Sequence, residues 1–152
     1  MGGTFDTPMP NLEDFAGDFR AYNDAVVDEF RHNRGQVTGM FAGAPLVLLS
    51  TTGAKSGKRR TTPVVYTRDG DRIVVIASKG GAPSHPDWYH NLVANPDVTV
   101  ELPDETFDAR AVVPTGEERE RLYRAQAGVM PNFDEYQKKT KRQIPVVVLE
   151  RV

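Results

Sequence analysis

The chain has 152 residues, 39% of them hydrophobic, and it carries a formal net charge of −2 with no cysteine. This length and composition are typical of one globular domain, and the lack of cysteine excludes disulfides, thiol catalysis and cysteine-based zinc sites. No run of about 18 apolar residues is present and the N-terminus lacks a cationic start and an apolar core, so we expect no membrane span, no secretory signal and a cytoplasmic location.

The chain begins with a segment rich in Gly, Pro and Thr, residues 1–10, which we expect to be a flexible tail before a single domain over 11–152. Asn11 is typical of a helix N-cap, and apolar residues then recur at steps of three and four up to Phe30. This spacing predicts an amphipathic helix of about six turns that ends near Asn33. Its polar face carries acids, which argues against contact with anionic lipid, so we interpret the apolar face as packed on the core.

Strand patterns follow the helix. Residues 46–51, 60–69 and 71–79 are rich in β-branched and apolar side chains. Asp69-Gly70 between the last two is a tight-turn pair. These two segments are therefore predicted to form a β-hairpin.

The second half of the chain alternates helices and strands. Pro86 fits the first turn of a short helix, which Asn95-Pro96 would end. Thr115 followed three residues later by Glu118 is a capping-box pattern that predicts a further helix. The remaining predicted elements are strands over 98–102, 106–114 and 144–152 and a short helix over 133–141.

The order of these elements indicates the fold class. The central strands come as hairpins rather than as strand–helix–strand units, which argues against a parallel dinucleotide-binding sheet. We predict an α+β fold in which about six antiparallel strands close into a barrel with flanking helices. Closure would also remove the exposed edges of the apolar strands.

Positive charge is concentrated between Ser50 and Arg68, a stretch without an acid. Its cations are Lys55, Lys58, Arg59, Arg60 and Arg68. Gly53 and Gly57 allow the backbone to approach a ligand closely, and Lys and Arg around backbone N–H groups suit a phosphate or carboxylate. The segment is not a P-loop, because Arg59 stands where Ser or Thr would hold magnesium and a strand follows. A solvated basic loop remains the alternative.

Other catalytic patterns are missing. The sequence contains no Gly-x-Ser-x-Gly elbow, and the three histidines do not have metal-ligand spacing, so we predict no metal site. No nucleophile or acid–base pair stands out. This combination favours a protein whose cofactor supplies the reactive group.

Four segments occur in a distinctive order: GAKSGKRRTTPVVY, VIASKGGAPSHPDWYHNL, NPDVTV and IPVVVL. Together they resemble the deazaflavin (coenzyme F-420)-dependent nitroreductases, actinobacterial enzymes also known as F-420H2-dependent quinone reductases. The resemblance covers the chain from about Phe15 to the C-terminus. It implies a split β-barrel of the flavin-reductase and pyridoxamine-oxidase type that binds reduced F-420, whose phosphate and oligoglutamate tail are strongly anionic.

The resemblance also implies the residues of the site. The anionic tail would be held by the side chains of Lys55, Lys58, Arg59 and Arg60 and by backbone donors of Gly53, Ala54, Ser56 and Gly57. The deazaflavin would lie against Pro63, Val64 and Val65, and the pocket would be completed by Ala77, Ser78, Lys79, Trp88 and Asn91. For Trp88, burial in the core is an equal alternative.

The implied reaction is hydride transfer from reduced F-420 to a small planar acceptor: a quinone, an unsaturated lactone or a nitro compound. Ser78 and Tyr136 are candidate hydroxyl donors to the acceptor oxygen, and Tyr66 is a further candidate whose face the strand alternation leaves open. Met130, Phe133 and Tyr136 would form the acceptor wall. Nitroimidazole-reducing members carry several tyrosines in this wall, so we predict poor turnover of bicyclic nitroimidazoles here and better turnover of quinones.

Three alternatives stay open at this stage. The same fold could bind FMN, or the chain could carry F-420 without catalysis. A nucleic-acid binder is opposed by the net charge of −2. The oligomeric state is open, and a lipid-dissolved quinone would make peripheral membrane contact plausible.

Overall fold

A computed structural model describes residues 19–152 of the chain, so the predicted tail and the start of the first predicted helix lie outside the described residues. The helices are α1 (Phe19–His32), α2 (Asp87–Ala94), α3 (Gly116–Val129) and α4 (Asn132–Lys139), with short 3-10 turns η2 (Gly39–Phe41) and η3 (Lys79–Gly81). The strands are β1 (Leu46–Thr52), β2 (Arg59–Asp69), β3 (Arg72–Ile76), β4 (Asp97–Glu101), β5 (Thr106–Val112) and β6 (Val146–Arg151). In the part of the chain described, no helix combines the length and apolar character needed to cross a membrane.

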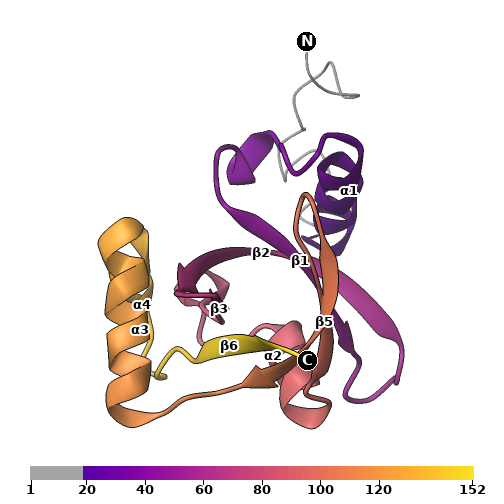
Figure 1. The fold of residues 1–152 in the computed structure, drawn as a ribbon. Coiled ribbons are helices and arrows are strands. Elements are labelled where there is room, and N and C mark those ends of the chain that lie inside the picture. Colours follow the sequence, from indigo (N-terminus) through magenta and orange to yellow (C-terminus); the bar gives the residue numbers. More distant parts are fainter. Residues whose placement is uncertain (1–18) are drawn as a thin grey trace.

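The six strands form a closed barrel in the order β1-β2-β3-β6-β5-β4, and every neighbouring pair is antiparallel. This confirms the predicted α+β barrel with flanking helices. The predicted hairpin is also confirmed, because Asp69 pairs with Arg72 across a turn in which Gly70 has a φ of +62°. Figure 1 shows α1 and the α3–α4 pair on opposite sides of the barrel.

Alternation along the strands divides the apolar side chains among three clusters. Val47, Leu49 and Val75 point into the barrel, where they pack with side chains from β4, β5 and β6. On the outside, Leu48 packs under α1, and Ile76 packs under α3 and α4. Burial of each such side chain stabilises the folded state by about 1.5–3 kcal/mol. Along each of these strands, alternate residues therefore point to opposite faces: one set fills the barrel interior, and the other packs against the helices outside.

The structure corrects one predicted strand boundary and one predicted helix cap. The third strand ends at Ile76 rather than at residue 79, because the chain turns away into η3 with Lys79 at a φ of +48°. Thr115 occupies the N-cap of α3, but its side chain makes no capping hydrogen bond. Glu118 instead accepts hydrogen bonds from Arg72 and Arg121, so the predicted capping box is wrong.

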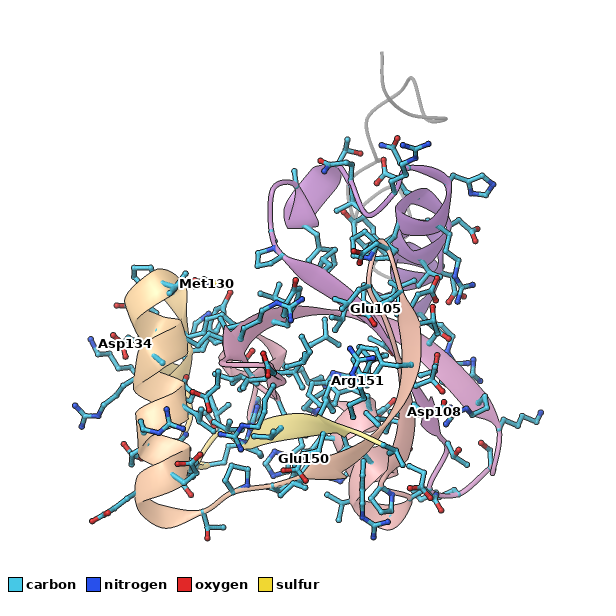
Figure 2. All side chains as sticks on the ribbon, viewed as in Figure 1. Glu105, Asp108, Met130, Asp134, Glu150 and Arg151 are labelled. Carbon is cyan, nitrogen blue, oxygen red and sulfur yellow. The ribbon has the colours of Figure 1, made fainter. Side chains whose placement is uncertain are left out.

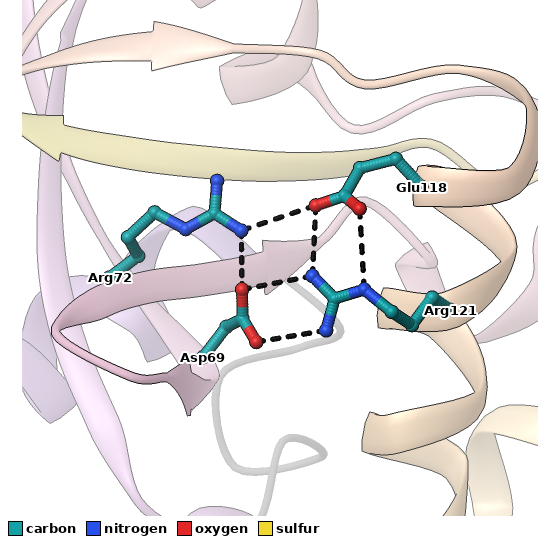
Figure 3. Close-up of polar contacts among 4 residues, drawn as sticks. All are labelled: Asp69, Arg72, Glu118 and Arg121. Carbon is teal, nitrogen blue, oxygen red and sulfur yellow. Dashed lines mark hydrogen bonds and ion pairs between the residues drawn. The ribbon is translucent and has the colours of Figure 1, made fainter.

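These two arginines, Asp69 and Glu118 form a four-residue charge network between the β2–β3 hairpin and α3 (Figure 3). Arg121 contacts Asp69 at 3.0 Å and Glu118 at 2.9 Å, and Arg72 contacts Glu118 at 3.1 Å and also pairs with Asp69. Hydrogen bonds from Arg121 and then from Arg72 lower the pKa of both carboxyl groups. The network balances two cations against two anions.

Candidate functional site

A groove of about 2040 Å³ lies on the outer face of the barrel, between its two helical sides. Its floor comes from β2 and the end of β3 and includes Pro63, Val65 and Ile76. One wall is α1 with the segment 41–45, and the other is the end of α3 with α4. The β1–β2 loop, η3 and α2 close one end. The groove thus gathers the predicted basic loop and the predicted acceptor wall, which are far apart in the sequence.

The β1–β2 loop is folded on itself. The N–H of Gly53 donates to the carbonyl of Lys58 at 2.8 Å, and the N–H of Gly57 donates to the carbonyl of Gly53 at 3.0 Å. A Cβ at Gly53 would collide with the hydroxyl of Ser56, and Gly57 has a φ of +70°. Both glycines are therefore needed for the shape of the loop.

Asn91 anchors the same loop to α2. Its Oδ1 accepts the N–H of Ala54 at 3.0 Å, and its Nδ2 donates to the hydroxyl of Thr51 at 3.3 Å. The backbone donors of Gly53, Ala54 and Gly57, which the resemblance assigns to the cofactor tail, are thus already used within the protein. What the loop presents to the groove is chiefly its side chains.

Cations without a partner carboxylate line this end of the groove. Lys55, Arg59 and Arg60 all line it, and no carboxylate among residues 19–152 lies within ion-pair distance of them. Arg59 lies across the barrel wall, where it donates to the hydroxyls of Thr52 at 3.2 Å and Thr99 at 2.6 Å. The uncompensated charge makes this end of the groove suitable for an anionic ligand.

Two of the predicted cations lie elsewhere. Lys58 is exposed but does not line the groove. Arg68 lies at the other end of β2, where it lines a separate cavity of about 640 Å³ together with Arg72 and Arg151. The five cations that are close in sequence therefore do not form one patch, because β2 carries them to both of its ends.

The segment after β3 brings Ser78 and Lys79 into the groove. Ser78 is buried, and Lys79 is exposed with its ammonium 3.3 Å from the hydroxyl of Ser84. Ala77 packs in the barrel interior and does not line the groove. Arg142, which follows α4, donates hydrogen bonds to backbone carbonyls of this segment and contacts His85 at 3.0 Å. No sequence pattern singles out Arg142, because it lies in an irregular connection.

His85 is held in one protonation state by this contact. Arg142 can only donate, so Nδ1 of His85 accepts and the ring proton sits on Nε2. Burial, followed by the charges of Arg142 and His90, lowers the pKa of His85. The imidazole is therefore neutral at pH 7.

The predicted acceptor wall is assembled on α3 and α4. Met130, where α3 gives way to α4 (Figure 2), lines the groove with Phe133 and Tyr136. The rings of Phe133 and Tyr136 meet edge to face with centroids 5.3 Å apart. Asn132 donates its amide N–H to the Tyr136 hydroxyl oxygen at 2.9 Å. Because that oxygen accepts, the hydroxyl hydrogen of Tyr136 is left to donate to another group.

Strand parity separates the remaining predicted residues. Val65 faces the groove side, and Val64 packs in the barrel interior but also lines the groove. Tyr66 has the same parity as Val64, packs against the interior cluster and does not line the groove. The structure therefore does not bring Tyr66 together with Ser78 and Tyr136.

Trp88 is both a core residue and part of the groove lining. Its side chain is only 8% exposed and belongs to the interior cluster, yet it also lines the groove. Sequence reasoning missed the opposite wall, where α1 contributes Asn23 and Asp28 and the following segment contributes Phe41. Only the packing of α1 on the barrel reveals that these residues face the predicted cofactor loop. Within residues 19–152 no three His, Asp or Glu side chains gather as a metal site.

Comparison with known proteins gives consistent matches. The family model described as F-420H(2)-dependent quinone reductase matches residues 23–151. A Mycobacterium tuberculosis (strain H37Rv) protein named F-420H(2)-dependent quinone reductase is 44% identical over 133 residues, which cover 85% of this chain and 87% of that protein. A solved F-420-H2 dependent reductase matches with a TM-score of 0.65 and 45% identity over 70% of this chain and 94% of its own. A structure described as a domain-swapped dimer matches with a TM-score of 0.67 and 37% identity over 91% and 98%.

Proposed function

The chain belongs to the F-420H(2)-dependent quinone reductase family, and on this premise we propose that it transfers a hydride from reduced coenzyme F-420 to a small quinone-type acceptor. One observation supports this most: a single groove joins cations that make no ion pair among residues 19–152 to an apolar floor and to a wall with a hydroxyl donor. An anionic planar cofactor and a planar acceptor need these three features together.

The residues present fit coenzyme F-420. Lys55 and Arg60 offer positive charge to its phosphate and carboxylate groups, and Arg59 adds a guanidinium already held in place by hydroxyls. Pro63 and Val65 offer the apolar surface that a planar ring needs. The groove, about 2040 Å³, exceeds the roughly 300–1,000 Å³ of an ordinary small-molecule pocket, so it can hold a cofactor and an acceptor together.

The bound reduced deazaflavin supplies the hydride, and the protein positions and polarises the acceptor. Tyr136 donates its hydroxyl hydrogen to the acceptor oxygen, where negative charge develops, while Asn132 holds the phenol oxygen. Ser78 adds a second hydroxyl at the floor of the groove. Met130 and Phe133 exclude water from the reacting groups, which strengthens these hydrogen bonds.

The function is tested by binding and turnover on one sample. The protein is titrated with oxidised F-420 by fluorescence beside an FMN control, and reduced F-420 is then mixed anaerobically with menadione. We expect tight F-420 binding, weak FMN binding and reoxidation of F-420 only when protein is present. Binding without reoxidation by any quinone would favour a carrier, and tighter FMN binding would favour an FMN enzyme.

The choice of acceptor follows from the wall. Tyr136 is the one hydroxyl-bearing aromatic residue in the segment 130–136, and its neighbours Met130 and Phe133 are apolar. We therefore expect kcat/KM for menadione to exceed that for a bicyclic nitroimidazole by at least about 10-fold, the difference that one or two polar contacts make. A kinetic comparison in which the nitroimidazole is the better substrate would contradict this expectation.

We propose a cytoplasmic location, with peripheral membrane contact if the acceptor is a lipid-dissolved quinone. Co-sedimentation with vesicles that contain a long-chain quinone tests the contact, and vesicles without quinone are the control. Because one similar structure is described as a domain-swapped dimer, light scattering on the same sample is needed to count grooves per particle.

A further inference from the structure

Arg142 holds the segment 77–85 at several points. The half-buried guanidinium donates to the carbonyls of Ala77 at 3.2 Å, Ser78 at 2.7 Å and Ala82 at 2.9 Å and contacts Nδ1 of His85 at 3.0 Å. All three guanidinium nitrogens take part. A lysine has no fixed planar fork of donors, so it cannot make this set of bonds from one position.

The same segment has an unusual backbone. Lys79 is not a glycine, yet its φ is +48°, and Gly81 has a φ of +83°. Such a conformation is unfavourable for a residue with a side chain and persists where the surroundings enforce it. The hydrogen bonds from Arg142 on either side of Lys79, to Ser78 and Ala82, supply that enforcement.

The segment also touches the acceptor wall. A Cβ built on Gly81 would come within 2.8 Å of the carbonyl oxygen of Tyr136 and within 3.0 Å of the Cβ of Lys139, so the backbone of η3 lies directly against α4. The segment carries Ser78 and Lys79 into the groove, and α4 carries Tyr136 into it. A displacement of the segment would therefore change the distance between the two sides of the site.

We propose that Arg142 is a positioning residue for hydride transfer, which clamps the segment 77–85 against α4 and so sets the separation between the floor around Ser78 and the hydroxyl of Tyr136. This inference rests on the proposed function. Arg142 does not line the groove, so it acts through the segment rather than on the ligand. The clamp lies outside the β1–β2 loop, which has its own anchor in Asn91.

The test compares R142A and R142K with the wild-type chain. The measurements are the Kd for oxidised F-420, kcat and KM for menadione with reduced F-420, and Tm. We expect R142A to lower kcat about 100-fold and to change Kd by less than about threefold, because a displaced reacting group is costly and the cations of the loop lie apart from the clamp. R142K keeps the charge but not the fork, so its kcat should also fall.

Chemical rescue separates positioning from folding. Guanidinium ion at millimolar concentration should restore part of the kcat of R142A, because it can occupy the vacated site. The matched control is R121A: Arg121 donates to Asp69 and Glu118 in the charge network, away from α4 and the segment 77–85, and it does not line the groove. R121A should lower Tm slightly, and guanidinium ion should leave its kcat unchanged.

Hydrogen exchange gives a readout that does not need activity. R142A should raise amide exchange within 77–85 at least about 10-fold relative to R121A, since the bonds that hold the segment are lost. Unchanged exchange there, or a wild-type kcat in both Arg142 variants, would overturn the clamp. Wild-type protein that never reoxidises reduced F-420 would instead overturn the proposed function, and with it the role of Arg142 in hydride transfer, whatever the exchange shows.

Discussion

Two charged regions of this molecule use the same residue types in opposite ways. In the groove, Lys55 and Arg60 have no carboxylate within ion-pair distance among the described residues, whereas Arg72 and Arg121 in the charge network each contact two carboxylates. A cation whose donors are taken by carboxylates joins one element to another. A cation kept apart from them is available for a ligand. Neighbours, rather than residue type, therefore distinguish a binding charge from a structural one.

The largest expected effect is on cofactor affinity. The double variant K55A/R60A should raise the Kd for F-420 at least about 100-fold, because each charge-assisted hydrogen bond contributes about 1.5–3 kcal/mol. Fluorescence titration measures this, and higher salt should weaken wild-type binding in the same direction. The matched control is R121A, which removes a paired cation and should bind F-420 as the wild type does. A Kd for K55A/R60A within threefold of the wild-type value would show that the groove cations do not bind the cofactor.

The next effect concerns the hydroxyl donor in the groove. Y136F should lower kcat with menadione about 10-fold or more and leave the Kd for F-420 unchanged, because the lost donor acts on the acceptor. Steady-state kinetics with reduced F-420 measure this. The matched control is Y66F. Tyr66 was also a candidate hydroxyl donor, but it packs toward the barrel interior. An equal loss of kcat in Y136F and Y66F would show that the position of Tyr136 in the groove wall does not matter for the reaction.

A smaller effect is expected from breaking the charge network. R121A should lower Tm by no more than about 4 °C, because exposed ion pairs are weak even when they share partners. Thermal unfolding followed by circular dichroism measures it. A change in F-420 affinity in the same variant would mean that the network and the groove are coupled.

The smallest effect is the pH dependence of the network. The pKa of Asp69 and of Glu118 is lower in the folded chain, mainly because Arg121 donates to each carboxylate. The unfolded state then binds more protons below their ordinary pKa values of 3.8 and 4.5, so the stabilising contribution is present above this range and is lost as pH falls through and below it. E118Q should show a flatter fall of Tm between pH 5 and pH 3 than the wild type, and an equally steep fall would contradict the assignment.

Much of the barrel was predictable from local patterns. The hairpin turn at Asp69-Gly70 and the β-branched runs are local features, and the fold follows from their order. The basic loop was also visible in the sequence, whereas the acceptor wall was implied by the family resemblance. Strand parity was visible too, but it did not say which residues border the groove: Val64 packs in the barrel interior and still lines the groove, whereas Tyr66, of the same parity, does not.

The parts that escaped prediction depend on contacts between distant segments. Arg142 lies 57 residues from His85 in the sequence, and no pattern in its neighbourhood marks it as a clamp. Asn91 lines the groove, but no local pattern indicates that its side chain also anchors the β1–β2 loop. The predicted capping role of Glu118 was lost because Arg72 and Arg121 offer it stronger partners.

The sequence by itself determined the strand and helix types, the closure into an antiparallel barrel and the supply of positive charge, because each follows from propensity, periodicity and composition along the chain. Only the tertiary structure decided which cations stay unpaired, which face of β2 becomes the groove floor, and what holds the segment 77–85. Those outcomes are set by hydrogen bonds and ion pairs between residues brought together by the closed barrel, and no spacing along the chain encodes them.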